Sequence, residues 1–231
     1  MAQWGELIHS GIAGWTARQR DADRRWIAAP DHTWEGVGEV EIDPADDHCL
    51  WAKRGRGILL NSREGKTADL FSQAELGSCE LQLEFLIPVK SNSGVYLLGQ
   101  YELQIVDSHG LPDDELTYRS CGGIYARWNA ETQTPYDGHP PLTNAALPAG
   151  EWQTLELVFW APRFDEAGRK VANARFQNVL LNGELIHESV ECSGPTRGAW
   201  REVDLPRGPL RLQGDHGPVA FRDIRVRTIF E

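Results

Sequence analysis

The sequence is poor in cysteine, and the four it has are far apart. Cys49, Cys79, Cys121 and Cys192 form no C-x-x-C motif and have no histidine pair at zinc-finger spacing. Nothing in the sequence points to the oxidising compartment that disulfides require. We therefore expect free thiols, buried or half-buried, and no ligand string announces calcium or another metal. No cofactor is expected.

Long hydrophobic runs are also missing. No window approaches eighteen consecutive apolar residues, which excludes a transmembrane helix, and we expect no membrane partner. The first residues, MAQWGELIHSG, lack the basic start and apolar centre of a signal peptide. A cytoplasmic protein is the default expectation, although a trimmed form of an exported protein would have the same sequence.

Basic residues are outnumbered by acidic ones. The chain has 23 Lys and Arg against 34 Asp and Glu, a formal net charge of −11, and no basic run offsets this charge locally. The negative electrostatic field of such a protein repels phosphate backbones, so we expect no nucleic-acid partner.

Familiar catalytic motifs are absent as well. There is no Walker loop, no dinucleotide-binding G-x-G-x-x-G after a strand, no H-E-x-x-H and no G-x-S-x-G. The segment YELQIVD places carboxylates at Glu102 and Asp107 with an amide, Gln104, between them. It therefore does not display the paired carboxylates of a retaining glycosidase.

What the sequence does contain is a series of short strand-like segments with turn residues between them. Apolar residues alternate in several of them, as half-buried strands require. The expected strands include 38–42, 49–53, 57–60, 79–87, GVYLL, YELQIV, WQTLELVFW, ARFQNVLL, ELIHESV, PLRLQ and VAFRDIRVRTI. Many short strands with few helices predict an all-β, two-sheet antiparallel sandwich, and no linker divides residues 1–231 into separate domains.

Local signals add detail to this prediction. Asn182-Gly183 is typical of a type I′ hairpin, because both central residues of that turn need positive φ. The last strand changes phase near Arg222, which predicts a bulge. Only residues 17–29 resemble a helix. Residues 127–152 form a long loop rich in Pro, Gly and Asn, a type of loop that is more often functional than idle.

Polar residues alternate with the apolar face in two of these strands. Glu80, Gln82 and Glu84 do so in one strand, and Glu102 and Gln104 in another. If the two strands lie side by side, their polar faces form a surface of carboxylates and amides suited to sugar hydroxyls. A solvated outer face would give the same pattern, so both interpretations stay open. The nine tryptophans favour core packing, with sugar stacking as the alternative.

Longer blocks carry a resemblance to a known family. The segments ADLFSQAELGSCELQLEFLIP, SNSGVYLLGQYELQIVDSHG, CGGIY, PPLTNAALPAGEWQTLELVFWAPRFD, LNGELIHESVECSGPT and GPLRLQGDHGPVAFRDIRVR resemble the 3-keto-disaccharide hydrolase domain family, in the same order, over about 11–227. The resemblance implies a concanavalin A-like jelly-roll sandwich, which agrees with the strand pattern.

The resemblance also implies an activity and a substrate. Such domains are expected to act on carbohydrate partners, glycosides whose sugar already carries a ketone at carbon 3. The ketone acidifies the hydrogen on carbon 2, so a base can remove it, the aglycone can be eliminated, and water can then be added. This route needs one base, one proton donor for the leaving oxygen and polar groups that hold the enolate.

The positions that match the family motifs give the candidate site. Glu102, Asp107 and His216 are the acid/base candidates. The matching residues expected to bind substrate are Glu84, Asn92, Gln104, Tyr125, Asn144, Gln213 and Arg222. Arg127 and Trp128, at the start of the long loop, are added to them without matching a family motif. Of all these, Tyr125, like Tyr101, could equally be a core residue, and Trp128 is expected to act as a lid or stacking residue.

The chain departs from the family pattern at Leu98 and Gln100, two positions that are commonly arginine. Arg127 could replace them from another direction. The departure keeps open a non-catalytic, lectin-like carbohydrate-binding module as the alternative function. A purely structural partner domain is a third possibility, against which the alternating charged faces argue mildly.

Overall fold

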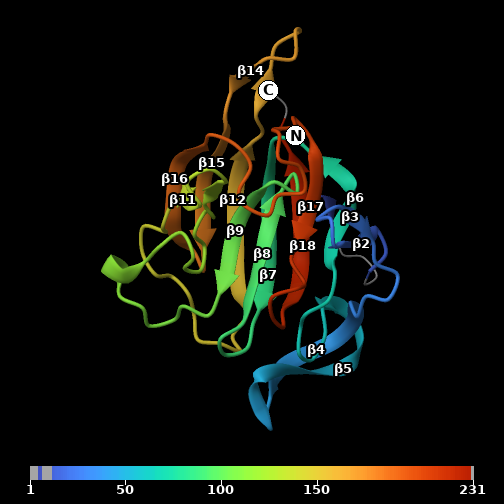
Figure 1. Cartoon of the computed structure of the whole chain (residues 1–231). Coiled ribbons are helices and arrows are strands. Elements are labelled where there is room, and N and C mark those ends of the chain that lie inside the picture. The colour runs from blue at the N-terminus through green and yellow to red at the C-terminus, as the bar shows by residue number, and fades with distance from the viewer. Residues whose placement is uncertain (1–4, 7–11, 230–231) are drawn as a thin grey trace.

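A computed structural model describes residues 5, 6 and 12–229 of the chain. Two antiparallel sheets face each other, which confirms the predicted all-β jelly-roll sandwich (Figure 1). In this part of the chain there is no α-helix, and the single helical turn is the 3-10 turn η1 (Asp113–Glu115).

The larger sheet has eight strands. Its order is β16 (Glu184–Cys192), β15 (Ala174–Leu181), β12 (Gln153–Trp160), β7 (Cys79–Leu86), β18 (Ala220–Thr228), β5 (Asp46–Leu60) and β4 (Glu35–Asp43), with β1 (Gly5–Glu6) also paired to β18. The long strands β4 and β5 extend away from the rest of the molecule as a two-stranded ribbon (Figure 1). The expected strands 49–53 and 57–60 are both parts of β5.

The smaller sheet has six strands and carries the polar residues of interest. Its order is β3 (Trp26–Ala28), β2 (Trp15–Arg20), β6 (Asp69–Leu76), β17 (Gly208–Leu212), β8 (Asn92–Leu97) and β9 (Tyr101–Val106). Two small hairpins lie outside both sheets: β10 (Arg127–Asn129) with β11 (Thr134–Tyr136), and β13 (Arg163–Phe164) with β14 (Lys170–Ala172).

The core lies between the sheets and follows the alternation in the sequence. Leu81 and Leu83 of β7 and Leu103 and Ile105 of β9 belong to the same buried cluster. Side chains at intervening positions point to the outer face of each sheet. The idea of one continuous polar surface over β7 and β9 is therefore wrong, because the two strands belong to different sheets whose outer faces point in opposite directions.

Several local predictions are confirmed. Asn182 and Gly183 have φ values of 54° and 83°, as a type I′ turn requires. The pairing of β18 with β7 shifts register between Arg222 and Arg225, which is the expected bulge. The four cysteines are free and buried. No helix within the described residues is long and apolar enough to cross a membrane.

The helix expected over residues 17–29 is wrong, because these residues form the β2–β3 hairpin. Trp15 and Ala17 point into the core with the period of a strand. Asp21 closes the turn: its Oδ1 accepts the backbone N–H of Asp23 at 2.9 Å and that of Arg25 at 2.9 Å. Local side-chain bonds of this kind favour a turn over a helix. The assignment of residues 1–231 to one domain stays a prediction.

Candidate active site

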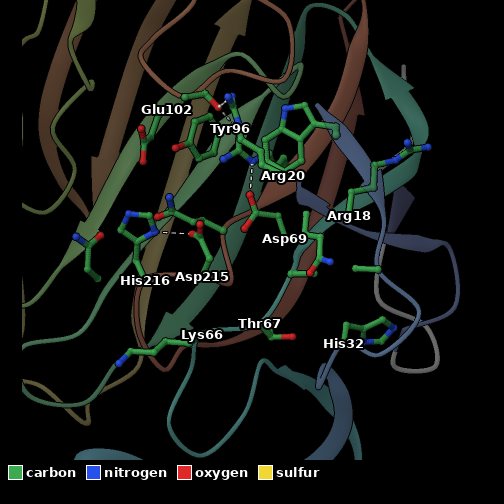
Figure 2. A pocket seen from close by; sticks show the side chains of 18 of the residues that line it. Arg18, Arg20, His32, Lys66, Thr67, Asp69, Tyr96, Glu102, Asp215 and His216 are labelled. Carbon is green, nitrogen blue, oxygen red and sulfur yellow. Dashed lines mark hydrogen bonds and ion pairs between the residues drawn. The ribbon is translucent and has the colours of Figure 1, made fainter. Parts of the chain in front are cut away.

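A cavity of about 800 Å³ lies on the outer face of the six-stranded sheet. Its floor is formed by side chains of β2, β6, β17, β8 and β9, and its rim by the segments 29–33, 66–68 and 213–216. Figure 2 shows Glu102 and Tyr96 along the floor, His216 and Asp215 on one side, and Arg18 and Arg20 on the other. Six of the predicted site residues line this cavity: Asn92, Glu102, Gln104, Tyr125, Gln213 and His216.

The strand pairing aligns three charged or phenolic side chains across the floor. Tyr96 of β8 lies opposite Glu102 of β9 and also opposite Arg211 of β17. The Tyr96 hydroxyl donates a hydrogen bond to the Glu102 carboxylate. On its other side, the guanidinium carbon of Arg211 lies 3.8 Å from the centre of the Tyr96 ring.

Arg211 is a buried cation held rigidly by its neighbours. Its Nε donates to Asp69 Oδ2 at 2.7 Å, and both side chains are almost fully buried. Its Nη1 donates to the Gly198 carbonyl at 2.8 Å. Burial by itself opposes the charge, but Asp69, Tyr96 and Glu102 raise the pKa of Arg211 above its ordinary value. The cavity floor therefore carries a protonated guanidinium, paired with Asp69 and fixed in place.

Glu102 has an unusual protonation equilibrium. Its side chain is buried, with the residue only 3% exposed. Burial raises the pKa of Glu102 to about 7, although the Tyr96 hydrogen bond and the charges of Arg211 and His216 lower it. A carboxyl group with a pKa close to neutral can both accept and release a proton, which is the property of a general acid/base.

His216 belongs to a pair of adjacent residues on the cavity rim. Its Nδ1 lies 2.5 Å from Asp215 Oδ1, and both side chains are about half exposed. The hydrogen bond that the His216 ring donates to Asp215 raises the pKa of His216, and the charge of Glu102 adds to the effect. Asp215 thereby orients the ring and favours its protonated form, which suits His216 to donate a proton.

Amide groups fill the space next to these residues. Gln104 Nε2 donates to Asn92 Oδ1 at 3.1 Å. Gln213 is buried, and its Oε1 accepts no hydrogen bond from any described residue. Unpaired buried carbonyl oxygens are costly. An incoming hydroxyl group could therefore satisfy Gln213.

The remaining predicted residues do not line the cavity. Asp107 lies just past the end of β9, where one carboxylate oxygen accepts the backbone N–H of Lys90 at 3.0 Å. This interaction holds a turn, and the prediction that Asp107 shares a hollow with Glu102 and His216 is wrong. The alternation of the strand explains why Asp107 lies apart from Glu102: odd-numbered residues of β9 point to the core side, whereas Glu102 and Gln104 point to the cavity.

Glu84 and Arg222 also lie outside the cavity, because their strands β7 and β18 belong to the eight-stranded sheet. They form an ion pair across β7 and β18, at 2.5 Å between Arg222 Nη2 and a Glu84 oxygen. The Arg222 guanidinium lies 4.0 Å from the centre of the Trp152 ring. This pair stabilises the outer face of the eight-stranded sheet and is remote from the cavity in the fold.

Three residues of the expected loop 127–152 that were predicted to bind substrate make structural contacts instead, and two of them, Arg127 and Trp128, lie on strand β10. Asn144 Nδ2 donates to the carbonyls of Ser108 and Leu111 at 2.7 and 2.9 Å. Arg127 Nη1 donates to Ser193 at 2.8 Å. Trp128 lies 4.1 Å below the guanidinium of Arg197, which does line the cavity, so Trp128 positions a cavity residue rather than lining the cavity itself.

The two departures from the family pattern lie in the β8–β9 turn. Leu98 and Gln100 are fully buried. Gln100 Nε2 donates to the carbonyl of Arg201 at 3.2 Å, and its Oε1 accepts the N–H of Leu205 at 3.1 Å. Gln100 thus anchors the segment 201–205, and the cavity obtains its positive charge from other positions.

Sequence reasoning missed several residues of the cavity. They are Arg18, Arg20, Trp26, Asp69, Tyr96, Arg197, Arg211 and Asp215. The isolated arginine in PLRLQ was the available signal, because a lone charge in an apolar strand needs a buried partner. Among the described residues, no cluster of three or more His, Cys, Asp or Glu side chains could hold a metal ion.

Comparisons with known proteins agree with this architecture. A curated relative from Bacteroides thetaiotaomicron, named 3-keto-disaccharide hydrolase, is 22% identical over 232 residues, which cover 85% of this chain and 74% of the relative. A solved structure from Parabacteroides distasonis, assigned as a glycosyl hydrolase, has 22% identity and a TM-score of 0.57, covering 93% of this chain and 91% of that one. A second structure from that organism, with the same assignment, has 18% identity and a TM-score of 0.58, covering 98% and 100%.

These two structures share the fold of the chain, and at such identity they establish the fold alone. The family comparison reaches further, because the description 3-keto-alpha-glucoside-1,2-lyase-like domain matches residues 4–227. That range takes in both sheets and every residue of the cavity described above. The chain therefore belongs to the family of 3-keto-alpha-glucoside-1,2-lyase-like domains.

Proposed function

We propose that the chain cleaves glycosides whose sugar carries a ketone at carbon 3, and that it does so by elimination in the cavity described above. The observation that carries the proposal is Glu102, a buried carboxyl group whose pKa is about 7. Glu102 lies on the cavity floor, separated from the fixed guanidinium of Arg211 by Tyr96 on the strand between them. This position suits removal of a weakly acidic C–H hydrogen.

The first step is proton abstraction. The Glu102 carboxylate takes the hydrogen from carbon 2, which the neighbouring ketone has acidified, and the electron pair of that bond moves onto the ketone oxygen. Arg211 supplies a positive charge that is already in place on the floor, so it stabilises the resulting enolate without reorganisation. The neutral Tyr96 hydroxyl keeps the Glu102 oxygens oriented.

The second step expels the aglycone. The enolate electrons return to form a double bond between carbons 1 and 2 while the bond from carbon 1 to the glycosidic oxygen breaks. His216 gives its proton to the departing oxygen, and Asp215 stabilises the histidine during this transfer. Addition of water across the new double bond restores the keto sugar, and the sum of the steps is hydrolysis.

Sugar binding is assigned to the amide groups. Gln104, Asn92 and Gln213 line the same part of the cavity, and planar amides both donate to and accept from hydroxyl groups. The unpaired Oε1 of Gln213 gains a partner when a hydroxyl enters. These residues act in binding and do not take part in proton transfer.

The experiment compares a 3-keto-glucoside with the same glucoside before oxidation. Purified protein is expected to release the aglycone from the ketone and to leave the unoxidised glucoside intact, because without the ketone the hydrogen on carbon 2 is not acidic. Equal cleavage of both compounds would refute the elimination route. Saturable binding of both with no aglycone released would instead support the lectin-like alternative.

A further inference from the structure

A second, smaller cavity adjoins the first on the side of Arg18, Arg20 and Trp26. It has a volume of about 500 Å³ and shares these three residues with the larger cavity. Its walls are the β2–β3 hairpin and the segment 199–202. The lining contains five arginines, Arg18, Arg20, Arg24, Arg25 and Arg201, against one acidic residue, Glu202.

This concentration of arginine is exceptional for the molecule, whose formal net charge is −11. Arg25 is neutralised by Asp21 and Asp23, at 2.9 and 2.8 Å. Within the described part of the chain, Arg18, Arg24 and Arg201 form no ion pair. Like charges gathered in one hollow repel each other unless an anion lies between them.

Two tryptophans hold two of the five guanidinium groups in place. Arg20 lies over the Trp26 ring at 4.9 Å, and Arg201 over the Trp200 ring at 4.8 Å. Arg20 Nη2 also donates to the carbonyls of Gly198 and Ala199, at 3.1 and 2.9 Å. Stacking leaves the edge N–H groups of a guanidinium available, and arginine matches carboxylate and phosphate oxygens in pairs.

The order of strands, taken with the proposed reaction, orients a bound sugar relative to these arginines. Arg18 is on β2, and Glu102 is on β9 at the far edge of the same sheet, with Asp69, Arg211 and Tyr96 on the strands between. In the proposed reaction, carbon 2 lies at Glu102, the ketone oxygen near Arg211 and the glycosidic oxygen at His216. Arg18 and Arg20 lie on the side of the cavity away from His216 (Figure 2). In this orientation carbons 4 to 6 of the same sugar are directed toward Arg18 and Arg20.

We propose that this second cavity, which we call the arginine pocket, binds an anionic group carried by the ketone-bearing sugar on the side away from the bond that is cleaved. A carboxylate or a phosphate at carbon 6 has the required chemistry. The inference rests on the proposed function for the orientation of the sugar, but the presence of an anion site can be tested separately.

The kinetic test uses four 3-keto-disaccharides. One is neutral, one has a carboxylate and one a phosphate at carbon 6 of the ketone-bearing sugar, and the fourth has a carboxylate on the leaving sugar. A charge-assisted contact corresponds to about a tenfold change in an equilibrium constant. At least one compound with the anion on the ketone-bearing sugar is expected to exceed the neutral one in kcat/KM by about tenfold or more.

Arg24 and Arg201 line the arginine pocket but not the larger cavity, so they are the residues to change. Arg24→Gln with Arg201→Gln is expected to reduce the preference for the anionic compound by about tenfold. The matched control is Arg56→Gln on the exposed part of β5, which removes the same charge and keeps the preference. Added salt should weaken the preference in the parent protein.

A binding measurement separates this inference from the proposed function. Calorimetry compares glucose with glucuronate and glucose 6-phosphate, which need no turnover, in the parent and the double variant. In one outcome the parent protein binds an anionic sugar more tightly than glucose, and the double variant loses this difference, while no disaccharide is turned over. That result would refute the proposed reaction but support the anion site. Two results would refute the assignment of the arginine pocket while supporting the proposed reaction. One is turnover of all compounds with no preference for an anionic one, and the other is a preference for the compound whose leaving sugar carries the carboxylate.

Discussion

Replacing Glu102 by glutamine tests the buried carboxyl group in two independent ways. The amide keeps the shape of the side chain and can still accept the hydrogen bond from Tyr96, but it can neither lose nor gain a proton in the working range. General acid/base catalysis contributes about 10²–10⁴-fold to a rate. We therefore expect kcat/KM for a 3-keto-glucoside to fall by about that factor, which corresponds to about 3–5 kcal/mol.

The same substitution lowers activity but should raise the free energy of unfolding at neutral pH. In the folded protein the pKa of Glu102 rises from 4.5 to about 7. Each unit is about 1.4 kcal/mol, so ionising this carboxyl group costs the folded state about 3 kcal/mol. Because the folded pKa is raised, this cost is absent below the unfolded pKa and complete above the folded one. The parent protein thus loses stability between pH 4.5 and about 7, and Glu102→Gln does not.

Thermal and urea unfolding at several pH values measure the difference. Above pH 7 the variant should be more stable by about 3 kcal/mol, or about 6–12 °C in Tm for a chain of this length. Below pH 4.5 the two proteins should converge. The control is Glu41→Gln at an exposed position of β4, which removes one negative charge outside the cavity. Parallel stability curves for parent and Glu102→Gln at all pH values, together with full activity, would refute the reasoning.

Three further substitutions probe the surroundings of Glu102. Asp215→Asn removes the bond that raises the pKa of His216, so the alkaline limb of the pH profile of kcat/KM should move to lower pH; an unmoved limb would mean that His216 is not the proton donor. Arg211→Leu leaves Asp69 as an unpaired buried charge and should destabilise the fold by about 3–5 kcal/mol in urea unfolding; a loss below about 1 kcal/mol would contradict the buried pair. Asp107→Asn should keep parent kcat/KM, because its carboxylate binds a backbone N–H outside the cavity; a hundredfold loss in that assay would return Asp107 to the active site.

Much of the architecture could be read from the sequence, because strand alternation reports directly on burial. The alternation in YELQIV places Leu103 and Ile105 in the core, and it places Glu102 and Gln104 together on the opposite face. The Asn182-Gly183 turn is equally local. Each of these features depends on a few adjacent residues, whose preferences agree with the final fold.

The errors arise where long-range pairing decides the outcome. Residues 17–29 contain good helix formers, but pairing of β2 with β6 and the Asp21 turn make them a hairpin. Glu84 has the same alternation as Glu102, and nothing local indicates that its strand belongs to the other sheet. Arg211 gains its importance from Asp69, 142 residues earlier in the chain. Such a partner can be found only when the sheet order is known.

The central claim is that Glu102 breaks a bond to hydrogen at carbon 2 before the aglycone leaves. It is tested most directly with a 3-keto-glucoside that carries deuterium at carbon 2, with an enzyme-free sample to measure spontaneous exchange. The account predicts that the aglycone is released more slowly than from the unlabelled compound. It also predicts that the sugar product has already lost its deuterium at the first time points, before spontaneous exchange in the enzyme-free sample. Release at an unchanged rate, with the deuterium retained at carbon 2, would contradict it.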